Sequence, residues 1–293
     1  MIRVLHFSDP HIEEGFAGVP LRAFLNKRLV GWANLVLRRR RRYREAAQKL
    51  LALQAFARGE SVDLVVCTGD LSSLGTMPEL RRAHELLAPF AAAPLGLATI
   101  PGNHDLYVED DGSFESLFGE FMGTDRPALA GQDGWPRVRL FGESLALITF
   151  LSARPNPQPW RSSGCVPAAQ LDALRAMLEG GELEGRFLLL GTHYALTLPD
   201  GSPDTRHHGM VNAAALRRVL APVSRGAYLH GHVHHCYQGR PQGLSIPSFG
   251  AGSVTDAGRE GFWLFEIAAD GAKARRGRWT GEGYALDAGA LVF

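Results

Sequence analysis

The feature that most constrains how this chain can fold is a pattern that recurs along it. A short apolar run ends at a turn, and polar side chains follow at once. The fullest example is Pro101-Gly102-Asn103-His104-Asp105, which follows an apolar run at 95–100. Each cluster alone also fits a turn, but a turn needs only one such side chain, so their recurrence favours a shared site. The other clusters are Asp9-Pro10-His11, Gly69-Asp70, Gly191-Thr192-His193 and Gly231-His232-Val233-His234.

The apolar runs predict buried strands that alternate with helices. Strands are expected at 2–7, 62–68 and 95–100, and helices at 45–56 and 76–88. Two strand–helix–strand units side by side predict a partly parallel sheet with helices on its faces, and therefore an α/β (α+β) fold. Later runs predict a hairpin about 142–144 and final strands at 244–246, 261–267 and 272–279. Without linkers or repeats, residues 1–293 are expected to form a single domain.

Composition excludes several other classes of protein. The formal net charge is +1, which gives no global reason to expect a stable nucleic-acid partner. Three widely separated cysteines make neither a disulfide framework nor a zinc ribbon and fit a reducing cytosol. The first apolar run is too short for a secretory signal, and no run approaches the roughly 20 residues of a membrane span. We therefore expect a cytoplasmic protein that is soluble or peripheral on the inner face of a membrane.

A basic amphipathic insertion is expected at about 16–44, here called the basic segment. Residues 20–44 hold nine cations and no anion, so the rest of the chain carries −8. Apolar residues recur at helical spacing beside the cations, which is typical of a helix at a membrane surface. A helix packed on the protein's own core with a solvated arginine tail is the alternative. The predicted membrane contacts are Leu21, Leu25, Trp32, Arg38, Arg39 and Arg40.

The strand-end side chains have the chemistry of metal ligands. Asp9 and His11 are two residues apart, and on an extended segment both would point to one side. Imidazole, carboxylate and amide groups without thiolate suit Mn²⁺, Fe or Zn²⁺, and they are too many for one ion. Two divalent ions are therefore expected, with Mn²⁺ preferred.

In their order and spacing, the five clusters resemble the motifs of the calcineurin-like metallophosphoesterases, whose fold is a pair of packed mixed β-sheets with helices outside. The resemblance implies that Asp9, His11, Asp70 and His234 hold one metal. Asp70 would bridge to a second metal held by Asn103, His193 and His232. His104 would donate a hydrogen bond or a proton to the substrate, with Asp105 fixing its tautomer. One departure is Leu106, where the family usually has an acidic residue, and another is Tyr194, where a second histidine is common.

The resemblance implies a metal-dependent phosphoester or pyrophosphate hydrolase but does not fix its substrate. Because of the basic segment, we favour a peripheral-membrane pyrophosphatase or phosphodiesterase acting on a lipid-linked nucleotide, such as UDP-diacylglucosamine of lipid A synthesis. Arg206, His207 and His208 follow the fourth cluster and are candidate contacts to an anionic substrate, although a surface loop is an equal interpretation.

Three alternatives remain open. A soluble cyclic-nucleotide phosphodiesterase would share the five clusters and need no membrane. A non-catalytic binding scaffold would have lost ligands, whereas every ligand position is filled here. A nuclease would use the arginine run, but the segment lacks interleaved stacking aromatics.

Overall fold

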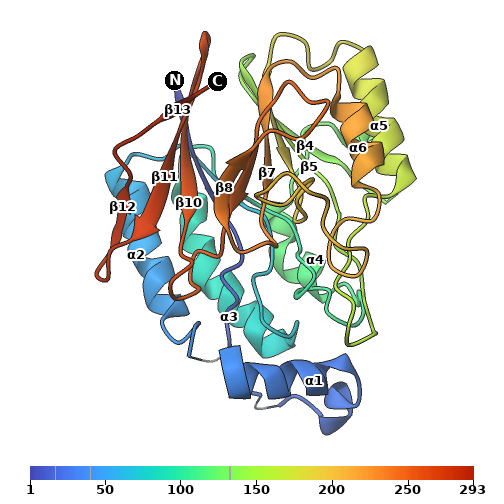
Figure 1. The fold of residues 1–293 in the computed structure, drawn as a ribbon, viewed down its shortest axis with the longest axis vertical. Coiled ribbons are helices and arrows are strands. Elements are labelled where there is room, and N and C mark those ends of the chain that lie inside the picture. The colour runs from blue at the N-terminus through green and yellow to red at the C-terminus, as the bar shows by residue number, and fades with distance from the viewer. Residues whose placement is uncertain (17, 40, 132) are drawn as a thin grey trace.

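A computed structural model describes residues 1–16, 18–39, 41–131 and 133–293. Two β-sheets pack face to face, with helices on their outer sides and α1 at the opposite end of the molecule from both termini (Figure 1). This arrangement confirms the predicted fold class. The prediction of a strand at 244–246 was wrong. Pro247 has no N–H to donate, and the strand begins after it, at Ser248.

The first sheet has the order β12-β11-β10-β1-β2-β3, with β13 beside β11. Strands β1, β2 and β3 are parallel, as the strand–helix–strand units predict, and β10 runs antiparallel to β1. Strands β8, β12 and β13, near or after the last cluster, were not predicted. The strands of this sheet are β1 (Ile2–Phe7), β2 (Leu64–Cys67), β3 (Leu97–Thr99), β10 (Phe262–Ala268), β11 (Gly271–Trp279), β12 (Tyr284–Leu286) and β13 (Leu291–Val292).

The second sheet has the order β4-β5-β6-β7-β9-β8. The predicted hairpin is present as the antiparallel pair β4 and β5, and β5, β6, β7 and β9 are mutually parallel along the sheet. Its strands are β4 (Arg137–Phe141), β5 (Leu145–Thr149), β6 (Phe187–Gly191), β7 (Gly226–His230), β8 (Cys236–Gly239) and β9 (Ser248–Ala251).

The core has two layers because side chains alternate across each strand. In β2, Leu64 and Val66 belong to the cluster between the sheets, whereas Val65 and Cys67 face the helices. Figure 1 shows α2 and α3 beside the first sheet and α5 and α6 beside the second. The helices are α1 (Lys27–Asn34), α2 (Ala46–Gly59), α3 (Met77–Leu87), α4 (Ser113–Phe118), α5 (Ala168–Glu179) and α6 (Ala213–Leu220). Shorter helical turns are η1 (Leu21–Phe24), η2 (Leu35–Arg39), η3 (Ala88–Ala92), η4 (Gly119–Phe121) and η5 (Pro127–Leu129).

The basic segment is not one continuous helix but three pieces, η1, α1 and η2. Leu35 is buried in a small cluster with Leu74 and Tyr107, but two cations of the segment are buried and several of its apolar side chains are exposed. Lys27 and Arg28 are buried: the Lys27 amine donates to the Arg161 carbonyl at 2.7 Å, and the Arg28 guanidinium donates to the Leu74 carbonyl at 3.1 Å. The exposed apolar side chains are Leu21, Leu25, Leu29, Val30, Trp32, Val36 and Leu37.

Three of the predicted membrane contacts are therefore exposed: Leu21 at 87%, Leu25 at 82% and Trp32 at 40%. Arg40 lies outside the described residues, and the structure describes only the backbone of Arg38 and Arg39. Across the described ranges, no helix is both long enough and apolar enough to span a bilayer.

Candidate metal centre

Five predicted ligands have a left-handed backbone, which is rare for residues other than glycine. The φ angles are 54° at Asp9, 43° at His11, 54° at Asp70, 66° at His232 and 55° at His234. Each such residue costs of order 1–3 kcal/mol and persists only where its surroundings hold it. The extended conformation expected for Asp9 and His11 was therefore wrong, although their side chains do converge.

Neighbouring loops hold these residues in place. The Asp9 amide donates to the Gly69 carbonyl at 2.9 Å, and the His11 amide donates to the Asp70 carbonyl at 3.0 Å. The glycines of the clusters are needed for close approach, because a Cβ on Gly102 would overlap Asp70 and one on Gly231 would overlap Asp9. The glycines therefore let the ligand loops pack directly on one another.

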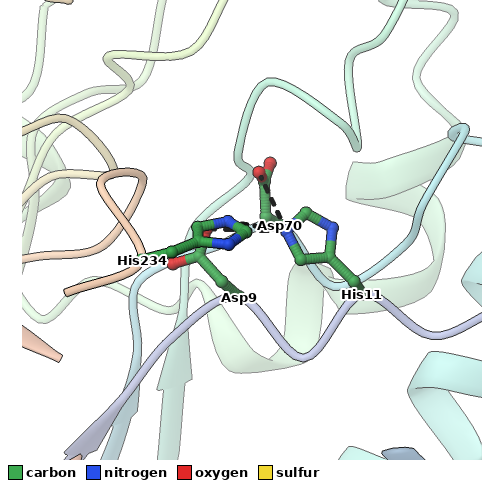
Figure 2. A group of neighbouring side chains, drawn as sticks. All are labelled: Asp9, His11, Asp70 and His234. Atoms are coloured by element: carbon green, nitrogen blue, oxygen red, sulfur yellow. Dashed lines mark hydrogen bonds and ion pairs between the residues drawn. The ribbon is translucent and has the colours of Figure 1, made fainter. Parts of the chain in front are cut away.

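The first group of ligands converges from loops after β1, β2 and β7. Figure 2 shows Asp9, His11, Asp70 and His234 with their polar atoms turned toward one another, and one ligand atom from each lies within 4.8 Å of the others. The Nε2 atoms of His11 and His234 are 3.0 Å apart, and His234 Nε2 is 3.2 Å from Asp9 Oδ1. Two nitrogens each about 2.0–2.1 Å from one ion lie roughly 3 Å apart, so this spacing fits a shared ion.

The second group shares Asp70. His193 Nε2 lies 3.5 Å from Asp70 Oδ2 and 3.1 Å from Asn103 Oδ1, and all three side chains are buried. His232 is close, with its ring 5.2 Å from that of His193, but its Nε2 faces the His208 carbonyl at 3.0 Å. Nδ1 is therefore the His232 atom that we assign to a second ion.

The residues present fit divalent ions. The buried atom Asp9 Oδ1 makes no hydrogen bond to any described residue, although His234 Nε2 lies 3.2 Å from it. A buried carboxylate oxygen left without a donor is costly, and a cation would compensate it. The donor set of imidazole, carboxylate and amide suits Mn²⁺, Fe or Zn²⁺.

Asp70 and His193 are buried neighbours, and each shifts the pKa of the other. Burial opposes ionisation of Asp70, but His193, His104 and His11 hold its pKa well below the usual value. Burial also opposes protonation of His193, but Asp70 raises its pKa to about 9. Asp70 is therefore an ionised carboxylate surrounded by imidazoles, which suits the bridging role that the sequence predicts for it.

His104 is oriented differently from what the sequence predicts. Its Nδ1 lies 2.6 Å from the Ser73 carbonyl, and its amide donates to Asp70 Oδ1 at 2.7 Å. Asp105 does not fix the tautomer: its oxygens accept from the amides of Leu71, Ser72 and Gly102 and from the Ser72 hydroxyl. The correction has a simple physical reason. The amides of Leu71, Ser72 and Gly102 lie beyond the ends of β2 and β3, and they donate to the Asp105 carboxylate instead. These hydrogen bonds organise the loop that carries His104.

A cavity of about 310 Å³ opens over the ligands. It is lined by both metal groups, by the loop after β6 and by the end of the basic segment. Of the three candidate substrate contacts, His208 lines this cavity, and Asp204 holds its ring through a 2.6 Å contact. Arg206 and His207 are exposed and do not line it.

Sequence reasoning missed several residues at this site. Asn34, Arg42, Tyr43, Ser162 and Arg259 line the cavity, and buried Asp256 lies behind His234 at 3.4 Å. The sequence drew attention to Arg42 only as one of the cations of the basic segment. None of the others follows an apolar run and a turn, so the pattern that revealed the ligands carries no signal for them.

The sequence matches the family described as calcineurin-like phosphoesterase over residues 2–236. It is 31% identical over 175 residues to a 3′,5′-cyclic adenosine monophosphate phosphodiesterase, CpdA, of Pseudomonas aeruginosa. That match covers 59% of this chain and 54% of the relative, so the chain spans about half the length of the curated relative it matches.

Two solved structures share the fold at low sequence identity. A dimetal phosphatase from Danio rerio superposes with a TM-score of 0.69 at 15% identity, covering 97% of this chain and 98% of that one. A purple acid phosphatase from yellow lupin gives a TM-score of 0.61 at 12% identity over 99% of this chain and 53% of that one. With the family match spanning most of the chain and the strand-end ligands in place, this protein belongs to the calcineurin-like phosphoesterase family.

Proposed function

We propose that this protein is a dinuclear-metal phosphoester hydrolase that uses Mn²⁺, with Fe or Zn²⁺ as alternatives. The observation that supports the proposal most is that Asp70 lies beside Asp9, His11 and His234 and also 3.5 Å from His193, at the edge of one cavity. Asp9, His11, Asp70 and His234 would hold one ion, and Asp70, Asn103, His193 and His232 the other. Two such ions supply a hydroxide-like water near neutral pH and stabilise the entering and leaving oxygens at phosphorus.

The chain's own residues complete the reaction. Because His104 Nδ1 faces the Ser73 carbonyl, we assign Nε2 to the substrate, where it donates to the phosphoryl or leaving oxygen. Tyr107 stacks on the His104 ring at 5.2 Å between centroids and limits its rotation. His208, paired with Asp204, would contact the substrate from the opposite loop.

This proposal is tested by hydrolysis of bis-p-nitrophenyl phosphate after loading with Mn²⁺. Asp70→Asn should abolish turnover, because the bridge between the two ligand groups is lost. Asp63→Asn is the matched control: its carboxylate accepts from the Arg3 amide at 2.7 Å, before β2 and outside the ligand groups, so turnover should be kept. Equal activity in wild type and Asp70→Asn would refute the proposed centre.

For the substrate, we propose a lipid-linked nucleotide such as UDP-diacylglucosamine, taken from an anionic membrane surface. Asn34, Arg42 and Tyr43 of the basic segment line the cavity, and the segment's apolar side chains are exposed. Trp160, 72% exposed, lies in the loop whose Arg161 carbonyl accepts from Lys27, which adds a further apolar side chain near the segment. Each Lys or Arg near an anionic leaflet adds about 1 kcal/mol, and Arg22, Arg41 and Arg44 are exposed.

A second candidate is a 3′,5′-cyclic-nucleotide phosphodiesterase, which the similarity to the Pseudomonas aeruginosa enzyme favours. One assay separates the two: turnover of UDP-diacylglucosamine in mixed micelles is compared with turnover of 3′,5′-cyclic AMP in buffer. The lipid proposal expects the micellar substrate to be preferred by at least tenfold in kcat/KM. Preference for cyclic AMP, or equal or no turnover on the lipid, would overturn it.

A further inference from the structure

Asp256 is a buried carboxylate in the loop between β9 and β10, and its two oxygens face three side chains. The Arg42 guanidinium donates to both oxygens, with Nε at 2.6 Å from Oδ1. The Tyr43 hydroxyl donates to Oδ2 at 3.4 Å, and His234 Nδ1 lies 3.4 Å from the same oxygen. One carboxylate therefore touches both the end of the basic segment and a metal ligand.

The contact with His234 is made on the side of the ring away from the metal group. His234 Nε2 faces His11 and Asp9, whereas Nδ1 faces Asp256 and, at 3.4 Å, the Tyr43 hydroxyl. A carboxylate on the far nitrogen of a ligating histidine fixes its tautomer and orientation and raises its basicity. Nδ1 of His11 and of His193 instead faces a backbone carbonyl.

The loop around Asp256 also grips the first metal loop. The Ser253 hydroxyl donates to the Asp9 carbonyl and the Thr255 hydroxyl to the Pro10 carbonyl, both at 2.6 Å. On its other side, the Ala257 amide donates to the Arg42 carbonyl at 3.0 Å. Residues 253–257 therefore connect the left-handed Asp9 turn with the end of the basic segment.

We propose that Asp256 is a positioning residue that sets the orientation and donor strength of His234 and clamps the basic segment through Arg42 and Tyr43. Ion binding at the first group and docking of the basic segment are then linked, and by reciprocity each strengthens the other. The inference rests on the metal group and not on the phosphoester activity or on the membrane surface.

The test is a calorimetric titration of the metal-depleted full-length protein with Mn²⁺. Asp256→Asn should weaken one of the Mn²⁺ binding steps by about 10- to 100-fold, the usual cost of losing such a partner. Glu260→Gln is the matched control, because Glu260 lies in the same loop and pairs with buried Lys49 at 2.7 Å. This control should lower thermal stability and leave Mn²⁺ affinity unchanged.

The linkage between ion binding and docking of the basic segment is tested separately by hydrogen exchange. A purely structural role of Asp256 would not make the exchange of α1 depend on Mn²⁺. In the wild type, Mn²⁺ should increase hydrogen-exchange protection of α1, and in Asp256→Asn this response should be lost. A folded Asp256→Asn variant with wild-type Mn²⁺ affinity overturns the positioning role, and an unchanged exchange response overturns the linkage.

If Asp256→Asn does not fold, Tyr43→Phe removes only the hydroxyl that bridges Asp256 and His234. It should weaken Mn²⁺ binding severalfold, and an unchanged affinity would overturn the proposal. These titrations use no substrate. They can therefore support or overturn the role of Asp256 even if the protein has no hydrolase activity.

Discussion

His104 differs from its neighbours at the metal centre in what surrounds its ring. Of the histidines predicted as ligands, His11, His193 and His232 are buried and His234 is half-buried. His104 is also half-buried, lines the cavity and packs between His11 and Tyr107. Its Nδ1 faces a backbone carbonyl, so the ring has a fixed orientation without being part of either ligand group. A histidine placed in this way suits proton or hydrogen-bond donation better than ligation.

We therefore predict that His104→Ala lowers kcat by about 10²- to 10⁴-fold, the usual contribution of a positioned general acid or base, and leaves Mn²⁺ affinity within severalfold of wild type. Steady-state kinetics and calorimetry check the two parts. His84→Ala is the control, since His84 pairs with Glu120 on the far side of α3 and should change neither quantity. Loss of metal binding in His104→Ala would instead make His104 a ligand.

Glu79 caps the start of α3, but its carboxyl group is buried, which disfavours its ionised form. Its Oε2 accepts from the amides of Leu74 and Thr76 and from the Thr76 hydroxyl, as part of a capping box at the start of α3. Its Oε1 is buried, and no donor among the described residues reaches it. Burial raises the pKa of Glu79 from 4.5 to about 7, although the Thr76 and Leu74 hydrogen bonds oppose this shift.

A carboxyl whose pKa is raised on folding holds its proton more tightly in the folded state, so its stabilising contribution is lost as pH rises from about 4.5 to about 7. We predict that the free energy of unfolding of the wild type, relative to Glu79→Gln, falls over this window by at most about 3 kcal/mol. Urea unfolding of both proteins between pH 4 and pH 8 measures it. A difference that does not vary with pH would contradict the prediction.

At the level of elements, two buried cations and buried Leu35 hold the basic segment on the protein body, whereas most of its other apolar side chains are exposed. Lys27 also lies 4.5 Å from the Tyr107 ring centroid, and burial lowers its pKa to about 8 despite the opposing charge of Asp70. Gly31 of α1 packs so closely on Tyr107 that a Cβ there would overlap its hydroxyl. These contacts bind α1 to the loop that carries His104, and they leave Leu29 and Val30 of α1 exposed.

We predict that the double variant Leu21→Glu/Leu25→Glu binds vesicles of anionic phospholipid at least about 100-fold more weakly. Burying one leucine contributes about 1.5–3 kcal/mol, and two exposed leucines are lost. Co-sedimentation measures vesicle binding, and hydrolysis of bis-p-nitrophenyl phosphate should stay within twofold of wild type. Leu51→Glu, at a leucine of α2 that is 55% exposed, is the matched control and should bind normally. Equal vesicle binding by all three proteins would contradict a membrane role.

At the scale of the whole molecule, the metal groups join the two sheets. Asp9, Asp70 and Asn103 follow β1, β2 and β3 of the first sheet, whereas His193, His232 and His234 follow β6 and β7 of the second. All of them come from the carboxyl ends of their strands, where an α/β fold presents its ligands. Ions bound here would therefore connect the sheets.

Removal of metal should for this reason destabilise the entire protein. At Mn²⁺ concentrations 100 times Kd, each site stabilises the folded state by about 2.7 kcal/mol, so chelation of both should cost about 5 kcal/mol and lower Tm by several degrees. Calorimetric melts with and without a chelator measure the change. In Asp70→Asn, the chelator should have a much smaller effect, and an equal effect in both proteins would show that the metal acts elsewhere.

The sequence alone predicted the strand-end clusters that converge at the site, the parallel strands β1, β2 and β3, and the helices between them. These features are local, because an apolar run followed by glycine and polar residues specifies a strand and its end without reference to distant segments. Gly102 and Gly231 belong to the same local pattern. Only the folded structure shows why glycine is needed there, because these residues pack closely against Asp70 and Asp9.

Only the tertiary structure decided which distant groups meet. Asp256 reaches Arg42 across 214 positions of sequence, and Asp105 turns to backbone donors instead of His104. Helical periodicity predicts that α1 has a polar and an apolar side, but it does not predict which side faces the protein body. The orientation depends on the Leu74 and Arg161 carbonyls, which accept hydrogen bonds from Arg28 and Lys27. Pairing and burial are properties of neighbours brought together by the fold, and a linear pattern does not contain them.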